Sequence, residues 1–361
     1  MAINPPGARN HGEGSTLIRL LAIWLVSGTC FLLVVLHYKT YATAIDACGD
    51  SSGYIEIARA ISKWNFSGLQ VFQFWGVSYL TAFISKITSL PLRPSLVIVS
   101  AGSSLLACFF ASRLWGWWVA AFFVILNFDW MQRSLLGGSE PTFMALLLGA
   151  FLLVRHEKWE WAALLASFAT ITRPLGLCAL LAIGIVLLQR RNYSKFFRAL
   201  AIGLTIGTLY IVPLRLYVHD SLANVHAYET SRPLFGIPLV AIVMGIFSDR
   251  YLTNLILSCA WVLFILSGVI LFLTSDACAE KRKAWPVEFI FAGLYTLMIC
   301  CYNYPQWALG NFARFAIPVI PFALLSLRRI LPKNEVLVWA SAFVFPVLAG
   351  ASAIGIRNIL H

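Results

Sequence analysis

Few side chains in this sequence could carry chemistry, and four of them stand at the ends of apolar runs. Asp50 follows the first such run and Glu140 precedes a later one, while Arg173 and Arg314 each stand beside an apolar run. A carboxylate can take a proton from a hydroxyl group, and an arginine next to apolar chain is costly unless it meets an anion. The four residues therefore indicate acid–base chemistry on an anionic substrate such as a phosphate.

Asp50 stands just ahead of a stretch whose apolar residues have a helical spacing. These residues recur at intervals of three and four: Tyr54, Ile57, Ala58, Ile61 and Trp64. The spacing predicts an amphipathic helix that lies along a membrane interface. Asp50 is then either the N-cap of that helix or a carboxylate that the helix holds at the membrane surface. The residues leave both interpretations open.

Glu140 and Arg173 each have a structural alternative to a role in chemistry. Glu140 stands before Pro141, so it can belong to an ordinary polar loop in which the proline opens the next helix. Arg173 can extend to the interface or form a salt bridge with Glu140; the functional alternative, which we favour, is a phosphate partner. Arg314 enters a later apolar run in the same way and is a second candidate for phosphate contact.

The segment between Tyr217 and Tyr251 is too long for a simple connector, and we expect it to form an interfacial lid. It contains four residues of types that can bind metals: His219, Asp220, His226 and Glu229. Their spacing matches no known metal site, so a solvated polar loop is favoured. We expect His219, together with Tyr54 and Asp46, to contribute to substrate binding on the face where Asp50 lies.

The composition defines the setting in which these side chains act. The chain has 361 residues, of which 60% are hydrophobic and 12% are charged, against roughly a quarter charged in soluble domains. Its hydrophobic runs are long enough to cross a hydrocarbon layer of about 30 Å. The net charge of +12 comes from basic residues between these runs, so membrane topology explains it better than nucleic-acid binding.

The basic clusters predict the topology, because basic residues mark the cytoplasmic ends of membrane spans. We expect about eleven spans, with the N-terminus inside and the C-terminus outside. The predicted spans lie near residues 20–38, 95–112, 114–127, 141–154, 160–172, 174–188, 197–217, 252–273, 287–302, 314–327 and 335–354. Residues 71–88 are interpreted as interfacial or re-entrant, because a crossing there would reverse every later span. The prediction is an all-α integral membrane protein with one polytopic domain, residues 1–361.

The predicted spans contain essentially no acidic residues in their interiors. Ion-coupled transporters usually need carboxylates or histidines near the midplane of the membrane, so this absence counts against transport. The acids and several arginines fall instead on the predicted outer face. This asymmetry favours an activity at the non-cytoplasmic surface.

Three runs of the sequence resemble the GT-C glycosyltransferases, multispan enzymes that use polyprenyl-phosphate sugars. The run DSSGYIEIA from Asp50 is similar to the signature in their first outer loop. The runs GGSEPTFMALLLGAFLL and WAALLASFATITRPLGL, which contain Glu140 and Arg173, resemble the mannosyltransferases that add the second mannose of GPI anchors and their prokaryotic relatives. The likeness covers about residues 45–190, a catalytic module that more variable helices over 197–361 would follow.

The resemblance implies a GT-C-like helix bundle and a transfer of sugar, mannose above all, with inversion. Asp50 would be the base and Glu140 a second catalytic carboxylate that orients the acceptor or holds a divalent cation, Mg²⁺ or Mn²⁺; the metal requirement stays open. Arg173 and Arg314 would bind the donor phosphate. The implied partners are a polyprenyl-phosphate sugar, membrane lipids and a lipid, glycan or protein acceptor.

Two other functions remain alternatives: a flippase or exporter of a lipid-linked glycan, and a non-catalytic member of a larger assembly. A flippase would require charged residues along a passage through the bilayer. For the location we favour a bacterial plasma membrane, with the endoplasmic reticulum membrane as the alternative and the active site outside the cytoplasm in either case.

Overall fold

A computed structural model describes residues 13–48, 50–66, 73–229, 233–248, 252–328, 331 and 334–353, and these residues form an almost entirely helical protein. The helices that fall on the predicted spans are α1 (Glu13–Tyr38), α5 (Leu92–Trp115), α6 (Trp117–Leu126), α8 (Glu140–Arg155), α9 (Trp159–Thr172), α10 (Leu177–Gln189), α11 (Tyr193–Pro213), α14 (Leu252–Thr274), α16 (Pro286–Cys300), α19 (Ile320–Leu327) and α20 (Glu335–Ala353). The other α-helices are α2 (Tyr41–Asp46), α3 (Ser51–Lys63), α4 (Gly76–Thr88), α7 (Phe128–Leu136), α12 (Ala223–Tyr228), α13 (Val240–Ser248), α15 (Ala279–Ala284), α17 (Pro305–Gly310) and α18 (Phe312–Phe315).

Several helices have the length and composition that a membrane requires. In the described chain, five continuous helices are long and apolar enough to cross a bilayer, and there are up to seven if each of two sharply bent helix pairs counts as one span. The all-α class is confirmed, and the apolar helices suit a protein embedded in a membrane. Shorter helices such as α6, with ten residues, measure about 15 Å at 1.5 Å per residue, less than the hydrocarbon thickness.

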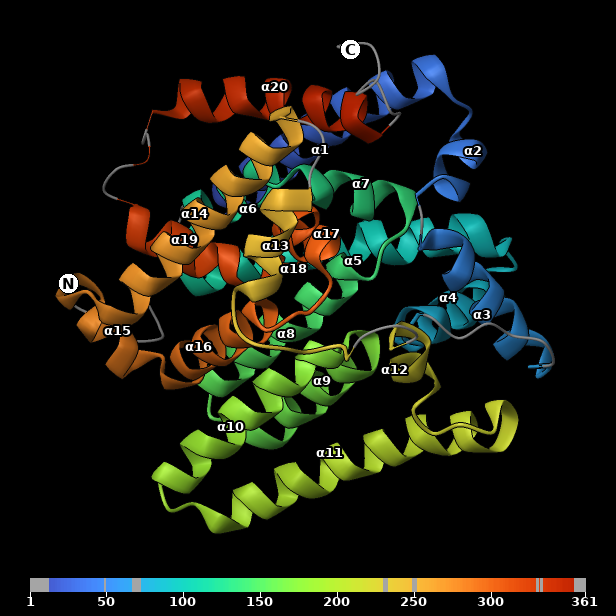
Figure 1. Ribbon diagram of the computed structural model, residues 1–361, viewed down its shortest axis with the longest axis vertical. Coiled ribbons are helices and arrows are strands. Elements are labelled where there is room, and N and C mark those ends of the chain that lie inside the picture. Colours follow the sequence, from blue (N-terminus) through green and yellow to red (C-terminus); the bar gives the residue numbers. More distant parts are fainter. Residues whose placement is uncertain are drawn as a thin grey trace.

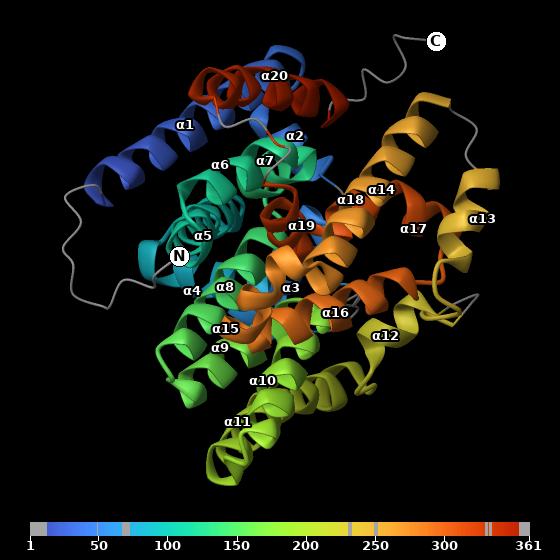
Figure 2. The ribbon, with the colours of Figure 1, turned by 90° about the vertical axis from the view of Figure 1, so that its left-hand side faces the viewer.

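The first and last helices run side by side in the same direction (Figure 1, Figure 2). Arg19 near the start of α1 pairs with Glu335 at the start of α20, at 2.9 Å. Further along, the Ser27 hydroxyl donates to the carbonyl of Ala342. The parallel arrangement agrees with the prediction that the first and last spans cross in the same direction.

Helices α2, α3 and α4 stay at one end of the bundle. Arg93 at the start of α5 pairs with Asp46 at the end of α2, at 2.8 Å, so the chain returns to the place where it left α1. The Ser78 hydroxyl of α4 donates to the carbonyl of Tyr54 in α3, which packs the two short helices together. Residues 73–88, the described part of the segment predicted to be interfacial or re-entrant, therefore begin and end on the same side.

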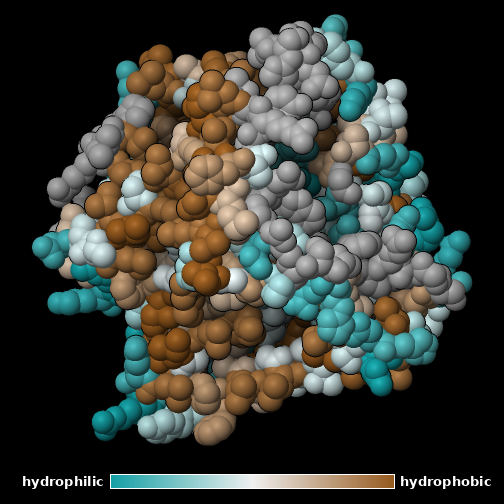
Figure 3. Space-filling model, in the orientation of Figure 1, coloured by the Kyte–Doolittle hydropathy of each residue, from teal (hydrophilic) through white to brown (hydrophobic). Residues whose placement is uncertain are grey.

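The opposite end of the bundle is basic. Helix α15 carries Lys281, Arg282 and Lys283 and lies at the left edge of Figure 1, whereas α2 and α3 lie at the right edge. Hydrophobic residues cover much of the surface between the two edges, and hydrophilic residues gather at both (Figure 3). This is the surface pattern that a protein in a bilayer would show if the bilayer were seen edge-on, with its two surfaces at the left and right of the view.

Three acids, Glu160, Glu288 and Glu335, fall at the ends of predicted spans, and Glu288 is the buried one. Glu288 in α16 is 1% exposed and pairs with Arg155 of α8 at 2.9 Å. The guanidinium of Arg155 also lies over the ring of Trp285, at 4.3 Å, and donates to the carbonyl of Leu114. A buried charge needs such a partner, so the pair holds α5, α8 and α16 together at the basic end.

Candidate functional site

Asp50 stands at the N-cap position of α3, but its carboxylate does not cap the helix. Its backbone N–H donates to the carbonyl of Cys48 at 2.7 Å, which turns the chain sharply before α3 begins. The carboxylate instead forms an ion pair with the guanidinium of Arg314. A second guanidinium, that of Arg133, lies 3.7 Å from the same carboxylate. Of the two interpretations left open by the sequence, the structure matches the carboxylate held by α3.

Glu140 is the first residue of α8 and is 2% exposed. Its Oε1 accepts hydrogen bonds from Arg173, at 2.5 Å, and from Nε of Arg314. Its Oε2 is buried without a hydrogen-bond partner among the described residues. The salt bridge between Arg173 and Glu140, the structural alternative considered for Arg173, is thus present. Glu140 thereby joins Arg173 to Arg314, the arginine that pairs with Asp50.

Two glycines make this approach possible. Gly137 has a φ of +87°, a left-handed conformation that most side chains disfavour, and it turns the chain between α7 and α8. A Cβ atom at Gly138 would lie 2.7 Å from Cβ of Arg133 and 2.8 Å from Oε2 of Glu140. Glycine is therefore required where these two charged side chains meet.

Arg173 stands where the chain changes direction between α9 and α10. Its backbone is extended, and Pro174 then opens a single 3₁₀ turn, Pro174–Gly176, before α10. Gly76 at the start of α4 packs directly against Thr172, because a Cβ atom there would lie 2.8 Å from backbone atoms of that residue. The guanidinium of Arg173 lies 5.8 Å from the centre of the Phe315 ring.

Arg133 belongs to the same cluster, although the sequence analysis did not select it as a site residue. It is 8% exposed, its Nη1 donates to the carbonyl of Cys48 at 3.1 Å, and its Nε is buried without a hydrogen-bond partner in the described chain. With Arg133 included, three arginines face the two carboxylates of Asp50 and Glu140, which leaves one positive charge in excess. The cluster therefore suits an anion.

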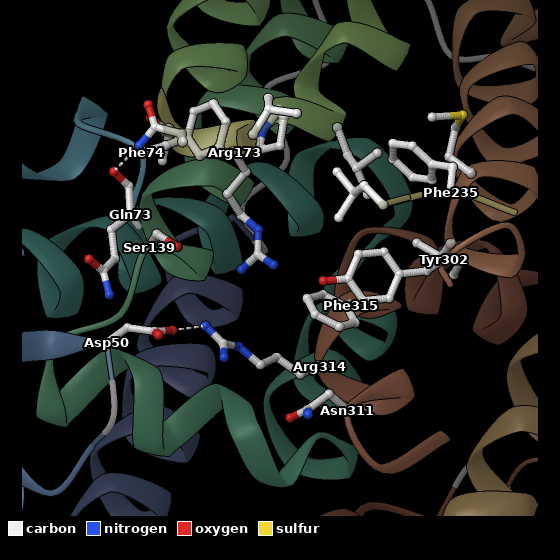
Figure 4. Close-up of a pocket in the computed structure, with 18 of the residues that line it drawn as sticks. Asp50, Gln73, Phe74, Ser139, Arg173, Phe235, Tyr302, Asn311, Arg314 and Phe315 are labelled. Carbon is white, nitrogen blue, oxygen red and sulfur yellow. Dashed lines mark hydrogen bonds and ion pairs between the residues drawn. The ribbon is translucent and has the colours of Figure 1, made fainter. Parts of the chain in front are cut away.

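The charged cluster forms one end of a cavity of about 410 Å³ (Figure 4). The polar and charged lining residues are Asp50, Tyr54, Gln73, Ser139, Thr172, Arg173, Asn224, Glu229, Tyr302, Asn311 and Arg314. The apolar lining residues are Phe74, Pro174, Leu175, Val225, Leu234, Phe235, Met298, Ile299 and Phe315. A cavity of this size with two arginines at one end and many apolar lining residues fits an amphipathic molecule that carries an acidic group.

Tyr54, for which we expect a role in substrate binding, lines this cavity from α3. Burial, reinforced by the charges of Asp50 and Glu140, raises the pKa of its hydroxyl group. Tyr54 is therefore a protonated hydrogen-bonding group at neutral pH rather than a base.

Asp46 and His219 do not reach the cavity. Asp46 is exposed and forms its ion pair with Arg93. His219 lies on the loop after α11, and its backbone carbonyl accepts a hydrogen bond from Arg215. Both were expected to bind substrate because they fall on the predicted outer face, but being on one face does not bring residues into one site.

The cluster does not suit a divalent cation. The described residues contain no group of three acidic, histidine or cysteine side chains that could hold a metal. The carboxylates of Asp50 and Glu140 are both in contact with arginines, and the cluster of these side chains is positive as a whole. A divalent cation would have to displace these arginines and would meet like charge.

No protein-family model and no curated protein matches this chain. The class that fold and site define is an all-α protein with membrane-length apolar helices and a buried arginine–carboxylate cluster at one end. Function has to be argued from that cluster and its cavity.

Proposed function

We propose that this protein is a GT-C type glycosyltransferase that moves a sugar from a polyprenyl phosphate to an acceptor hydroxyl, with mannose as our first choice of sugar. One observation carries the proposal: Asp50 contacts Arg314 at the cationic end of a cavity that apolar and aromatic side chains line together with several polar ones. A lipid phosphate matches both parts of that cavity. The resemblance of residues 45–190 to the GT-C mannosyltransferases adds the sugar and the transfer reaction.

The reaction is a substitution at the anomeric carbon of the sugar. The acceptor oxygen attacks this carbon and forms the new C–O bond, while its proton passes to the carboxylate of Asp50. The bond from the anomeric carbon to the phosphate oxygen breaks, and the electron pair leaves with the lipid phosphate. Attack from the face opposite the leaving group inverts the configuration.

The arginines supply what the leaving group needs. A lipid phosphate departs as a stable anion, so no general acid is required, and Arg173 and Arg314 stabilise the charge that develops on it. When the phosphate enters, it takes over part of the contact that Glu140 makes with both arginines. Glu140 thus keeps two cations fixed in position for the phosphate, and the chemistry proceeds without a metal ion.

The proposal includes the topology of about eleven spans and an active site on the non-cytoplasmic face. This topology requires that the chain between the first and second predicted spans begins and ends on the same side of the membrane, and the ion pair of Arg93 with Asp46 supports this. The basic residues of α15 support a cytoplasmic location for the opposite end. The membrane is that of a bacterial cell or of the endoplasmic reticulum.

The test is transfer of label by the purified protein. Polyprenyl phosphates that carry radiolabelled mannose, glucose or arabinose are incubated with the protein and with membrane lipid or glycan acceptors. We expect label to leave the donor, and the Asp50→Asn variant to transfer it at least about 100-fold more slowly with unchanged donor binding, since general-base catalysis contributes on that order.

Asp46→Asn is the matched control, because Asp46 is an aspartate at the same end of the bundle that does not reach the cavity. It is expected to keep full transfer. Full activity in Asp50→Asn would contradict the role of the base. Movement of intact donor between leaflets with its sugar still attached would support a flippase instead.

A further inference from the structure

Around the cavity, a carboxylate, two arginines and two aromatic rings follow one another in this order. Asp50 pairs with Arg314, and Arg173 lies against Phe315. The Phe315 ring lies 5.2 Å from that of Tyr302, measured between ring centres. Figure 4 shows the same order, with the two arginines between Asp50 on one side and the rings of Phe315 and Tyr302 on the other.

This order fixes how a lipid phosphate with an attached group must lie. If the phosphate binds the two arginines, its apolar chain extends to the side of Phe235, Tyr302 and Phe315, whose rings contact one another and offer it an apolar surface. The group on the other phosphate oxygen then lies on the side of Asp50. The residues that recognise this attached group are therefore to be sought among the lining residues on the side of Asp50.

Gln73 stands on that side, in the chain just before α4 (Figure 4). Its side-chain amide packs against α3 one turn after Asp50, since a Cβ atom at Gly53 would lie 2.3 Å from its Oε1. Its backbone carbonyl accepts a hydrogen bond of 2.7 Å from Asn224 of α12, and Asn224 in turn accepts one of 2.7 Å from the hydroxyl of Tyr210. The position of Gln73 is thus fixed from α3, α11 and α12.

The side-chain amide of Gln73 takes part in no hydrogen bond among the described residues. An uncharged carboxamide offers one acceptor and two donor hydrogens, which matches a group with neighbouring hydroxyls. A charged side chain in the same place would compete with Asp50 for Arg314. The amide therefore adds recognition without disturbing the charge of the cluster.

We propose that the Gln73 amide is a binding subsite for the hydroxyl groups of the transferred sugar, beside the carboxylate of Asp50. The inference rests on the proposed function and deepens it, because it names the residue that distinguishes a sugar-bearing lipid phosphate from the bare lipid phosphate.

The experiment compares two ligands. Affinities of the purified full-length protein for polyprenyl phosphate and for polyprenyl-phosphate mannose are measured by displacement of a labelled lipid phosphate. Wild type is expected to prefer the sugar-bearing ligand. Gln73→Ala is expected to lose that preference by roughly tenfold, the worth of one to two hydrogen bonds, with unchanged affinity for the bare lipid phosphate.

Two further variants separate recognition from structure. Gly53→Ala leaves Gln73 in the sequence but displaces its amide, so it is expected to lose the same preference. Gln189→Ala changes an exposed glutamine at the end of α10 and is expected to behave as wild type. Thermal melting of every variant reports whether the fold is kept.

Three results would overturn the subsite: no preference in wild type, an unchanged preference in Gln73→Ala, or an equal loss of affinity for both ligands. The last result would mean that Gln73 only supports the cavity wall. Transfer of label is read separately. A protein that shows the Gln73-dependent preference but transfers no label keeps the subsite and loses the transferase, and the reverse result loses the subsite alone.

Discussion

Glu140 holds both arginines of the cavity, and its replacement tests the charge balance of the site. Glu140→Gln removes one of two carboxylates that face three arginines. We expect the free energy of unfolding to fall by about 3 kcal/mol, because a buried ion pair loses its partner. We also expect tighter binding of lipid phosphate and slower transfer, since the arginines keep their charge but lose their position. Thermal melts and donor titrations measure both; weaker phosphate binding in a folded variant would contradict the assignment.

The sequence predicted the members of this cluster better than their contacts. Asp50, Glu140, Arg173 and Arg314 were selected because charges are scarce next to apolar runs, and the structure brings all four together. Arg133 was passed over because its neighbour in the structure, the carbonyl of Cys48, lies 85 positions away in the chain. Its position four residues before Gly137, on a short helix with a polar face, was the one local signal.

The turn between α7 and α8 is the element on which the cluster depends. We expect Gly138→Ala to reduce transfer at least about tenfold and to destabilise the protein by roughly 1–3 kcal/mol, because the added methyl group would overlap Arg133 and Glu140. Gly102→Ala in α5 is the matched control, since a Cβ atom there meets nothing within 4 Å, and it is expected to be neutral or slightly stabilising. Activity and melting temperature are compared for both; equal behaviour would mean that the turn is not critical.

The helices were predictable from composition, and their breaks were not. Every predicted span falls on helical chain because apolar runs separated by basic residues leave few other conformations in lipid. The sharp bend of 104° between α7 and α8 depends on where Gly137 and Gly138 let two charged groups approach. Such an approach is a tertiary contact, and hydropathy carries no information about it.

At the scale of the whole molecule, the cluster and the basic helix α15 lie at opposite ends, so labelling can establish the sidedness of the site. Lys63→Cys, Lys86→Cys and Lys283→Cys each place a thiol at an exposed position. We expect an impermeant maleimide on intact cells to label the first two, and the third only after permeabilisation, with the modified peptides read by mass spectrometry. If Lys86→Cys, like Lys283→Cys, were labelled only after permeabilisation, the segment before α5 would cross the membrane. The reverse of the whole pattern would keep the fold but put Asp50 on the cytoplasmic face, where basic residues would then be scarce, against the rule that orients such proteins.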